Sequence, residues 1–187
     1  GLRLPNPTML AAGILGLSGA SLHEAAKNGA GAVVTKSVGL KPRSGYANPA
    51  VVQVECGLLN AMGLPNTGAK DFAKEIQELK KVGLKVPVIA SVFGFSGEEF
   101  AEAAHILTQA GADAVELNVS CPHVDKTGSE IGQNPKLVAK VVKRVKNTVD
   151  TPVIVKLTPN VADIVEVAKA GVKAGADGVT AINTVRA

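Results

Sequence analysis

The sequence predicts an α/β protein in which strand–helix units repeat along the chain. Hydrophobic residues make up 46% of the 187 residues and aromatic residues only 3%, a composition that excludes low-complexity disorder and is typical of short, Val-rich buried strands. A glycine-led turn also recurs before three strand-like runs, as Gly29-Ala30-Gly31, Gly111-Ala112-Asp113 and Gly175-Ala176-Asp177. Because a glycine directly after a helix permits the left-handed turn that ends it, each copy indicates a helix followed by a strand.

Six strand-like runs follow one another, with a helical stretch in each interval. They lie near residues 8–12, 32–37, 86–92, 113–119, 152–157 and 177–182. Capping residues mark some of the helices: Ser21 with Glu24, and Ser96 with Glu99, have capping-box spacing, and Asn134-Pro135 is typical of an N-cap followed by a first-turn proline. Apolar periodicity places further helices near residues 68–82 and 161–174.

Successive βα units build a parallel sheet with right-handed crossovers. The regular phase of the repeat favours a (β/α)8 TIM barrel over an open doubly wound sheet, and the first run lacks the Gly-x-Gly-x-x-Gly of the dinucleotide-binding form of that alternative. A complete barrel takes about 250 residues. We therefore expect residues 1–187 to be a single barrel domain that covers about the first six βα units, with roughly two units missing at the C-terminal end.

Charge and cysteine usage exclude several classes of function. The chain has 20 basic and 16 acidic residues but one Tyr and four Phe, so it offers no stacking platform for bases and we expect no nucleic-acid partner. Its two cysteines make no disulfide framework, and no signal peptide or membrane-spanning apolar run is present. These features predict a cytoplasmic protein with no membrane contact. No cluster of His, Cys, Asp or Glu has metal-ligand spacing, so no metal site is expected.

Polar side chains stand where four of the predicted strands end. They are Lys36, Asn118, Lys156 and Asn183. In a barrel these positions converge on one mouth, where active sites lie. A single lysine there is most simply a solvated surface residue, but the set indicates a site. Lysines suit an anionic ligand or a cofactor that gains negative charge, and asparagine amides both donate to and accept from amide or ureide edges.

Two loops near this mouth leave alternatives open. Cys121 lies in a loop with Gly128 and Gly132 that is typical of a lid, although an isolated cysteine is more often inert, as we expect for Cys56. The segment 38–66 is too long for an ordinary connection. Gly63 within it permits close backbone approach to a ligand carboxylate, and the alternative is a purely structural β-hairpin.

Several segments, in this order and spacing, resemble the dihydroorotate dehydrogenase family over essentially all 187 residues. They are Asn60 to Asn66 (Asn-Ala-Met-Gly-Leu-Pro-Asn), Asn118 to His123 (Asn-Val-Ser-Cys-Pro-His), Val155 to Leu157 (Val-Lys-Leu), Asn183-Thr184, Asn6-Pro7 and Lys36-Ser37. The resemblance implies a (β/α)8 barrel with FMN at its mouth that oxidises (S)-dihydroorotate to orotate in pyrimidine synthesis. Cys121 then corresponds to the base of the soluble classes, which removes the C5 proton while a hydride passes from C6 to flavin N5.

The resemblance also implies the remaining site residues. Those expected at the substrate are Lys36, Asn60, Met62, Gly63, Leu64, Asn118, His123, Asn183 and Thr184. Those expected at FMN are Ala12, Gly13, Lys36, Ser37, Asn118, Lys156 and Ile182. The likeness is greatest to the NAD-linked form, which implies a homodimer or a heterotetramer with a partner subunit that carries FAD and an iron–sulfur cluster. Fumarate is the alternative electron acceptor.

Two features depart from the family pattern. His123 stands where many members have a further substrate-binding asparagine, and the glycine-rich flavin-phosphate loops of strands seven and eight are not in this sequence. Because a Cys-Pro-His run also occurs in the related dihydropyrimidine dehydrogenase domain, that flavoenzyme is the nearest alternative. A catalytically inactive barrel that only binds a ligand or a partner is the other.

Overall fold

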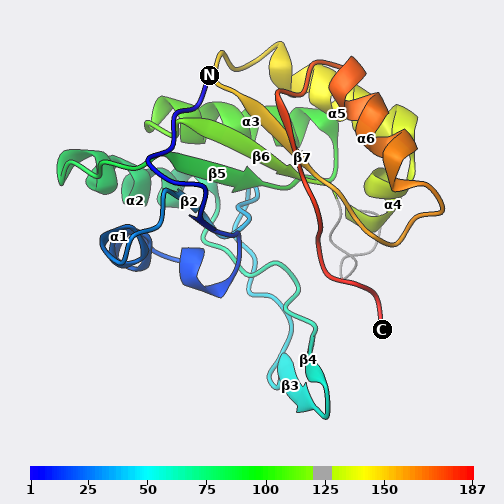
Figure 1. Ribbon diagram of the computed structural model, residues 1–187, viewed down its shortest axis with the longest axis horizontal. Helices are drawn as coiled ribbons and strands as arrows, with labels where there is room; N and C mark the ends of the chain where they lie inside the picture. Colours follow the sequence, from blue (N-terminus) through cyan, green and yellow to red (C-terminus); the bar gives the residue numbers. More distant parts are fainter. Residues whose placement is uncertain (120–127) are drawn as a thin grey trace.

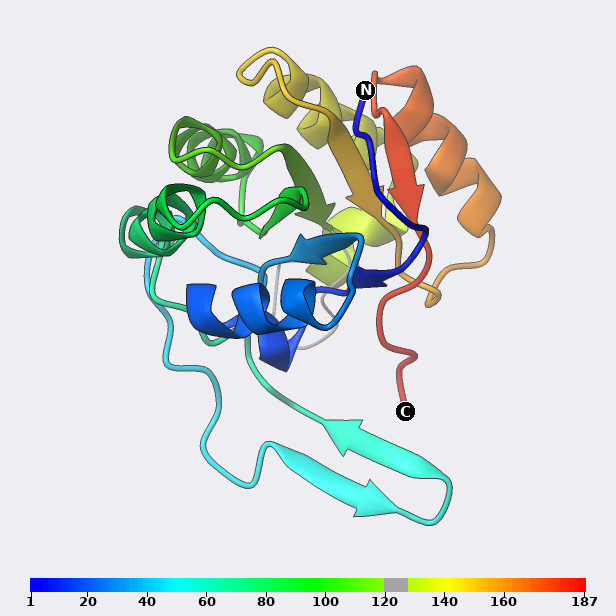
Figure 2. The same ribbon diagram turned by 60° about the vertical axis from the view of Figure 1, so that its left-hand side comes forward.

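Six parallel strands form one curved sheet in the computed structural model, which describes residues 1–119 and 128–187. Their order is β1 (Met9–Leu10), β2 (Ala32–Val34), β5 (Val88–Val92), β6 (Ala114–Asn118), β7 (Val153–Lys156) and β8 (Gly178–Thr180). Each strand pairs in parallel with the next along this order, and Figure 2 shows the sheet curving from the blue strands to the red one. The prediction of a partial (β/α) barrel is confirmed.

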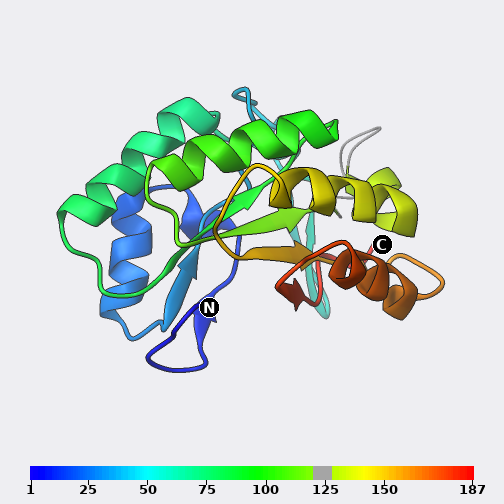
Figure 3. The same cartoon turned by 90° about the horizontal axis from the view of Figure 1, so that it is seen from above.

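Helices cover the outer face of this sheet (Figures 1 and 3). They are α1 (Gly19–Lys27), α2 (Ala69–Lys81), α3 (Gly97–Gln109), α5 (Pro135–Lys146) and α6 (Ile164–Lys173). A 3-10 helix, η1 (Ile14–Gly16), follows β1, and the short α4 (Gly128–Gln133) precedes α5. No helix in residues 1–119 or 128–187 combines the length and apolar character needed to cross a membrane.

Most of the predicted helix starts are confirmed, and one is wrong. Asn134 caps α5 by accepting from the backbone N–H groups of Lys136 and Leu137, and Ser96 caps α3 by accepting from Glu99 N–H. By contrast, α1 begins before Ser21. Its cap is Ser18, whose side chain accepts from Ser21 N–H at 3.3 Å, because a serine three residues upstream already supplies the acceptor that the first turn needs.

Two aspartates of the repeated turn each bond both to the first residue of a neighbouring strand and to a lysine of the helix that precedes that strand. Asp113 Oδ2 accepts from Val88 N–H at 2.8 Å and from Lys80 Nζ at 2.7 Å. In the next unit Asp177 Oδ2 accepts from Val153 N–H and from Lys146 Nζ, both at 2.8 Å. The repeat therefore has a structural role that fixes the starts of β5 and β7.

The two faces of the sheet bury different residues because side chains alternate along each strand. Val88, Ala90 and Val92 of β5 pack into the main core between sheet and helices. The opposite face encloses a smaller apolar cluster of Ala32, Val34, Ile89 and Ala114, with Ile154 against it. Two residues further along β5, β6 and β7, the same inner face carries polar residues, namely Ser91, Glu116 and Lys156. The barrel interior thus changes from apolar to polar toward the carboxyl ends of the strands.

The long segment after β2 contains an antiparallel hairpin. It pairs β3 (Val51–Val54) with β4 (Gly57–Asn60) and projects away from the body in Figures 1 and 2. Several of its apolar side chains are exposed, Leu58 by 69%. Figure 2 places the hairpin on the side toward which the strands of the sheet point.

Asp177 makes the stability of the fold pH-dependent. Burial alone would raise the pKa of this carboxyl, but the hydrogen bonds from Lys146 and Val153 and the charge of Lys146 outweigh burial and lower it. Because the folded-state pKa lies below the unfolded value of about 3.9, this stabilisation is present above about pH 4 and is lost as pH falls through the folded-state pKa. We expect Asp177→Asn to lower the urea midpoint of the full-length protein at pH 7, and this difference to shrink toward zero in acid.

The matched control is Asp150→Asn, because Asp150 is exposed. We expect it to leave the midpoint unchanged at both pH values. A midpoint difference between Asp177→Asn and the parent that stays constant from neutral pH into acid would contradict this assignment.

Candidate active site

A cavity of about 260 Å³ opens at the carboxyl ends of the strands. This volume lies just below the range of about 300–1,000 Å³ that is usual for small-molecule sites. Its walls come from the ends of β1, β2, β6 and β7, the chain after β8, and the hairpin with the segment that follows it. The lining residues are Ala12, Gly13, Ile14, Lys36, Ser37, Val51, Leu58, Asn60, Met62, Gly63, Leu64, Asn118, Lys156, Asn183 and Thr184.

The structure brings together nearly all of the described residues that the sequence indicated. Every one of them except Ile182 lines this cavity, and the Ile182 side chain is 46% exposed. Cys121 and His123 lie outside the described residues. The cavity therefore joins segments from both ends of the chain, although their contacts with any ligand stay predictions.

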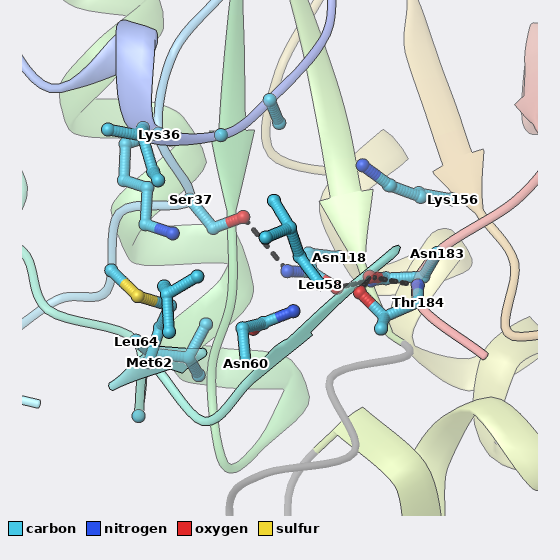
Figure 4. A pocket seen from close by; sticks show the side chains of 15 residues that line it. Lys36, Ser37, Leu58, Asn60, Met62, Leu64, Asn118, Lys156, Asn183 and Thr184 are labelled. Atoms are coloured by element: carbon cyan, nitrogen blue, oxygen red, sulfur yellow. Dashed lines mark hydrogen bonds between the residues drawn. The ribbon is translucent and has the colours of Figure 1, made fainter. Parts of the chain in front are cut away.

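The two lysines approach the cavity from different strands (Figure 4). Lys36 follows β2, and its N–H donates to Gly16 O at 2.8 Å; a Cβ on Gly16 would collide with this backbone, so η1 packs tightly here. Lys156 ends β7 and is only 8% exposed. Its Nζ lies 3.9 Å from Oε1 of Glu116, a buried carboxylate on β6. This pairing offsets the cost of burying the ammonium group.

The polar side chains between the lysines form a hydrogen-bonded row, drawn with dashed lines in Figure 4. Asn118 Nδ2 donates to Ser37 Oγ at 2.8 Å, and Asn183 Nδ2 donates to Asn118 Oδ1 at 3.0 Å. Asn183 Oδ1 accepts from Thr184 N–H at 2.8 Å. These bonds hold both asparagine amides in defined orientations at the cavity wall.

The segment after the hairpin has an unusual backbone. Gly63 has φ 72° and Leu64 has φ 57°, a left-handed conformation that is uncommon for a residue with a side chain. Asn66 holds the segment, because its Nδ2 donates to Leu64 O at 2.9 Å and its Oδ1 accepts from Gly68 N–H at 2.9 Å. Neither Gly63 N–H nor Leu64 N–H donates to another residue of the described chain. Backbone donors of this kind are suited to a carboxylate.

Sequence reasoning missed the apolar part of the cavity. Ile14 comes from η1, and Val51 and Leu58 come from opposite strands of the hairpin. The hairpin alternative was therefore right about the local structure, but the hairpin also lines the site. Alternation within 51–60 could have indicated this, since Leu58 and Asn60 share one face of β4 and both reach the cavity.

Comparison with known proteins gives the family. A model described as dihydroorotate dehydrogenase matches residues 1–187. The chain belongs to the dihydroorotate dehydrogenase family. The catalytic subunit of dihydroorotate dehydrogenase B (NAD(+)) from Methanosarcina acetivorans is 54% identical over 187 residues, which are 100% of this chain and 60% of the relative. The subunit of the same name from Pyrococcus furiosus is 53% identical, over 100% of this chain and 61% of the relative.

The chain spans about 60% of the length of these dihydroorotate dehydrogenase relatives. The curved six-stranded sheet agrees with a partial barrel of this family. Within residues 1–119 and 128–187, no group of three or more His, Cys, Asp or Glu side chains is placed to hold a metal ion.

Gly63 provides a test of the site's backbone. A Cβ at this position would lie 2.8 Å from Tyr46 N, and φ 72° would be strained for any L residue. We expect Gly63→Ala to distort the segment and to cost roughly 1–3 kcal/mol of local stability. The Tyr46 N–H bonds to Met62 O at 3.2 Å, and we expect it to exchange its hydrogen faster in Gly63→Ala than in the parent protein.

Gly57→Ala is the matched control, because a Cβ on Gly57 would meet nothing within 4 Å. It should leave the exchange of Tyr46 N–H unchanged. Equal exchange rates in Gly63→Ala and the parent would show that the segment does not depend on glycine.

Proposed function

We propose that the full-length protein is an FMN-dependent dihydroorotate dehydrogenase that oxidises (S)-dihydroorotate to orotate in pyrimidine biosynthesis. The observation that carries the proposal is the convergence of two lysines with the hydrogen-bonded amides of Asn118 and Asn183 in one cavity of a chain of this family. Lysine charge suits an anionic substrate and a cofactor that becomes anionic, and the amides match the edges of a pyrimidine ring.

The donor set of the cavity fits a flavin. Ala12 and Gly13 are small and leave room for a flat ring, while Ile14 and Leu58 offer apolar contact. Lys156 would lie beside the polar N1–C2=O edge, with Ser37, Lys36, Asn118 and, more distantly, Ile182 completing the set. When bound, FMN supplies the acceptor at N5 for the hydride that leaves C6 of the substrate. Lys156 would stabilise the negative charge that develops in this transfer.

The substrate would be held by residues of three segments. Asn118 and Asn183 would bind the ring, and Thr184 and Asn60 would extend that contact. The segment Met62 to Leu64 would bind the carboxylate through its backbone donors, with Lys36 contributing charge. These contacts would align C6 of the substrate for hydride transfer.

The proton chemistry is assigned to Cys121. Its thiolate would remove the proton from C5 of dihydroorotate while the C6 hydride departs, which leaves the C5–C6 double bond of orotate. His123, in the same segment, would donate a hydrogen bond to the substrate in place of asparagine.

The names of the relatives support a proposal for the electron acceptor and the assembly. Two of them are named catalytic subunits of an NAD(+) enzyme. We infer a partner subunit with FAD and an iron–sulfur cluster that passes electrons to NAD in a heterotetramer in the cytoplasm. Reduction of fumarate by a homodimer is the alternative.

Turnover of the purified full-length protein tests the proposal. We expect it to bind FMN and to produce orotate from dihydroorotate. Reduction of the flavin by dihydrouracil or dihydrothymine, but not by dihydroorotate, would favour a dihydropyrimidine dehydrogenase-type enzyme. Failure to bind FMN would favour an inactive ligand-binding barrel.

Lys156→Ala tests the electrostatic role. We expect the variant to bind FMN and to slow flavin reduction by orders of magnitude, because the charge that stabilises the transition state is lost. The measurement is stopped-flow bleaching of the flavin absorbance by dihydroorotate. Lys140→Ala, which removes an exposed lysine of α5, is the control and should match the parent. A near-normal rate for Lys156→Ala would contradict the assignment.

Cys121→Ser tests the assignment of the base. Serine is nearly the same size as cysteine, so the variant should keep FMN and orotate binding. Its hydroxyl is a far weaker acid than a thiol and therefore a poorer base at neutral pH. Its reductive half-reaction should slow by roughly 10²–10⁴-fold, and the residual rate should rise with pH. Cys56→Ser is the control, because Cys56 is exposed on the hairpin. If Cys121→Ser bleaches as fast as the parent at every pH, His123 becomes the residue to examine.

A further inference from the structure

A buried carboxylate lies beneath the cavity, and the proposed chemistry does not use it. Glu116 of β6 is 4% exposed, and its two oxygens accept from hydroxyls on the adjacent strand β5 and on β8, which lies beyond β7. Ser91 Oγ of β5 donates to Oε1 at 3.2 Å, and Thr180 Oγ1 of β8 donates to Oε2 at 2.9 Å. Glu116 is thus held in place from two directions.

The Glu116 carboxylate is the start of a hydrogen-bonded chain that ends at the cavity wall. Ser91 Oγ lies 3.0 Å from Ser37 Oγ, which lies 2.8 Å from Asn118 Nδ2. Asn118 Oδ1 in turn accepts from Asn183 Nδ2 at 3.0 Å. Five side chains from strands β5 and β6 and the ends of β2 and β8 therefore form one continuous chain.

The donors and acceptors along this chain can be assigned from chemistry alone. A carboxylate only accepts, and a serine hydroxyl has one proton to donate. Ser91 must therefore donate to Glu116, which leaves Ser91 Oγ as the acceptor for the Ser37 proton. Ser37 Oγ can then only accept from Asn118, so the amide nitrogen of Asn118 must face Ser37.

The same logic reaches the last residue. With its nitrogen toward Ser37, Asn118 presents Oδ1 to Asn183, whose nitrogen must donate. Asn183 Oδ1 is left to accept, and it accepts from Thr184 N–H at 2.8 Å. The chain is consistent from end to end with a single direction of donation.

We propose that Glu116 is a positioning residue that, through Ser91 and Ser37, fixes the amide orientations of Asn118 and Asn183 and so determines which hydrogen-bonding edges the site recognises. A reversed Asn118 amide would offer a donor where the site now has an acceptor. Recognition of an edge lacking its hydrogen-bond partner is strongly penalised, so one orientation gives selectivity.

Glu116 has a second effect through Lys156. The 3.9 Å separation of Nζ and Oε1 exceeds hydrogen-bond length, so the interaction is electrostatic. The carboxylate is satisfied by Ser91 and Thr180, and it provides a counter-charge for the lysine from below the cavity. One buried group therefore acts on both the lysine and the amides.

Neutron diffraction of the deuterium-exchanged full-length protein tests the direction of the chain. We expect the Ser91 deuteron to point to Glu116, the Ser37 deuteron to Ser91, and the deuterated nitrogen of Asn118 to Ser37. A Ser37 deuteron directed at Asn118 would overturn the proposal.

Ser91→Ala tests dependence on Glu116, because it breaks the chain and leaves the Glu116–Thr180 and Glu116–Lys156 interactions in place. The bond from Thr184 N–H to Asn183 Oδ1 stays in place at the other end of the chain, but without the link to Glu116 it has to orient both amides, so we expect the Asn118 amide to populate both orientations. Thr180→Val is the matched control, since it removes the other donor to the same carboxylate without interrupting the chain, and Asn118 should keep its orientation. An unchanged, single orientation of the Asn118 amide in Ser91→Ala would contradict the proposal. Glu116→Met removes the carboxylate that accepts from Ser91, so it should have the same effect on the Asn118 amide as Ser91→Ala.

The effect of the Glu116 chain on pyrimidine recognition rests on the proposed function, and orotate affinity measures it separately. We expect Ser91→Ala to weaken orotate binding roughly tenfold relative to Thr180→Val, as for the loss of one well-placed hydrogen bond. Orotate binding is followed through the flavin absorbance. If the parent protein fails to bind orotate, the proposed function is wrong while the neutron result still decides the direction of the chain. Equal orotate affinity in Ser91→Ala and Thr180→Val would contradict the link to recognition.

Discussion

Side chains of a strand alternate between the two faces of a sheet, and this constraint decides which residues reach the cavity. On β6, Ala114, Glu116 and Asn118 face the barrel interior in succession, and the register aligns Asn118 with Lys156 on β7. A shift of one residue in this pairing would turn the polar groups toward the helices and the valines toward the cavity. The apolar cluster around Ile89 and Ala114 holds the register, so packing at one end of the strands positions chemistry at the other.

Buried charge is the second constraint. An isolated carboxylate or ammonium group would be costly inside the barrel, so the opposite charges of Glu116 and Lys156 stabilise each other there, and hydroxyl donors further stabilise the Glu116 carboxylate. Of those donors, Ser91 comes from the adjacent strand β5 and Thr180 from β8, which lies beyond β7. The energetic requirement of one buried pair thereby ties four neighbouring strands together directly beneath the cavity.

Much of the architecture could be predicted from the sequence, because its signals are local. The glycine-led turns and the Val-rich runs located the five strands after β1, and the strand ends predicted that Lys36, Asn118, Lys156 and Asn183 would meet. The hydrogen-bonded chain could not be predicted, because it depends on which of Ser37, Ser91 and Thr180 face one another across strands. Alternation within 51–60 indicates which residues share a face of the hairpin, but where the hairpin lies relative to the cavity depends on how the long segment 38–66 folds back, and local periodicity does not determine that.

A crystal structure of the full-length protein with FMN and orotate bound would show whether both ligands occupy this cavity. We expect orotate to lie in the cavity, with its ring in hydrogen-bond contact with the side chains of Asn118 and Asn183 and its carboxylate at the backbone of Gly63 and Leu64. The flavin is predicted to lie against Lys156. Orotate bound elsewhere, or a flavin out of contact with Lys156, would show that these residues do not form the active site.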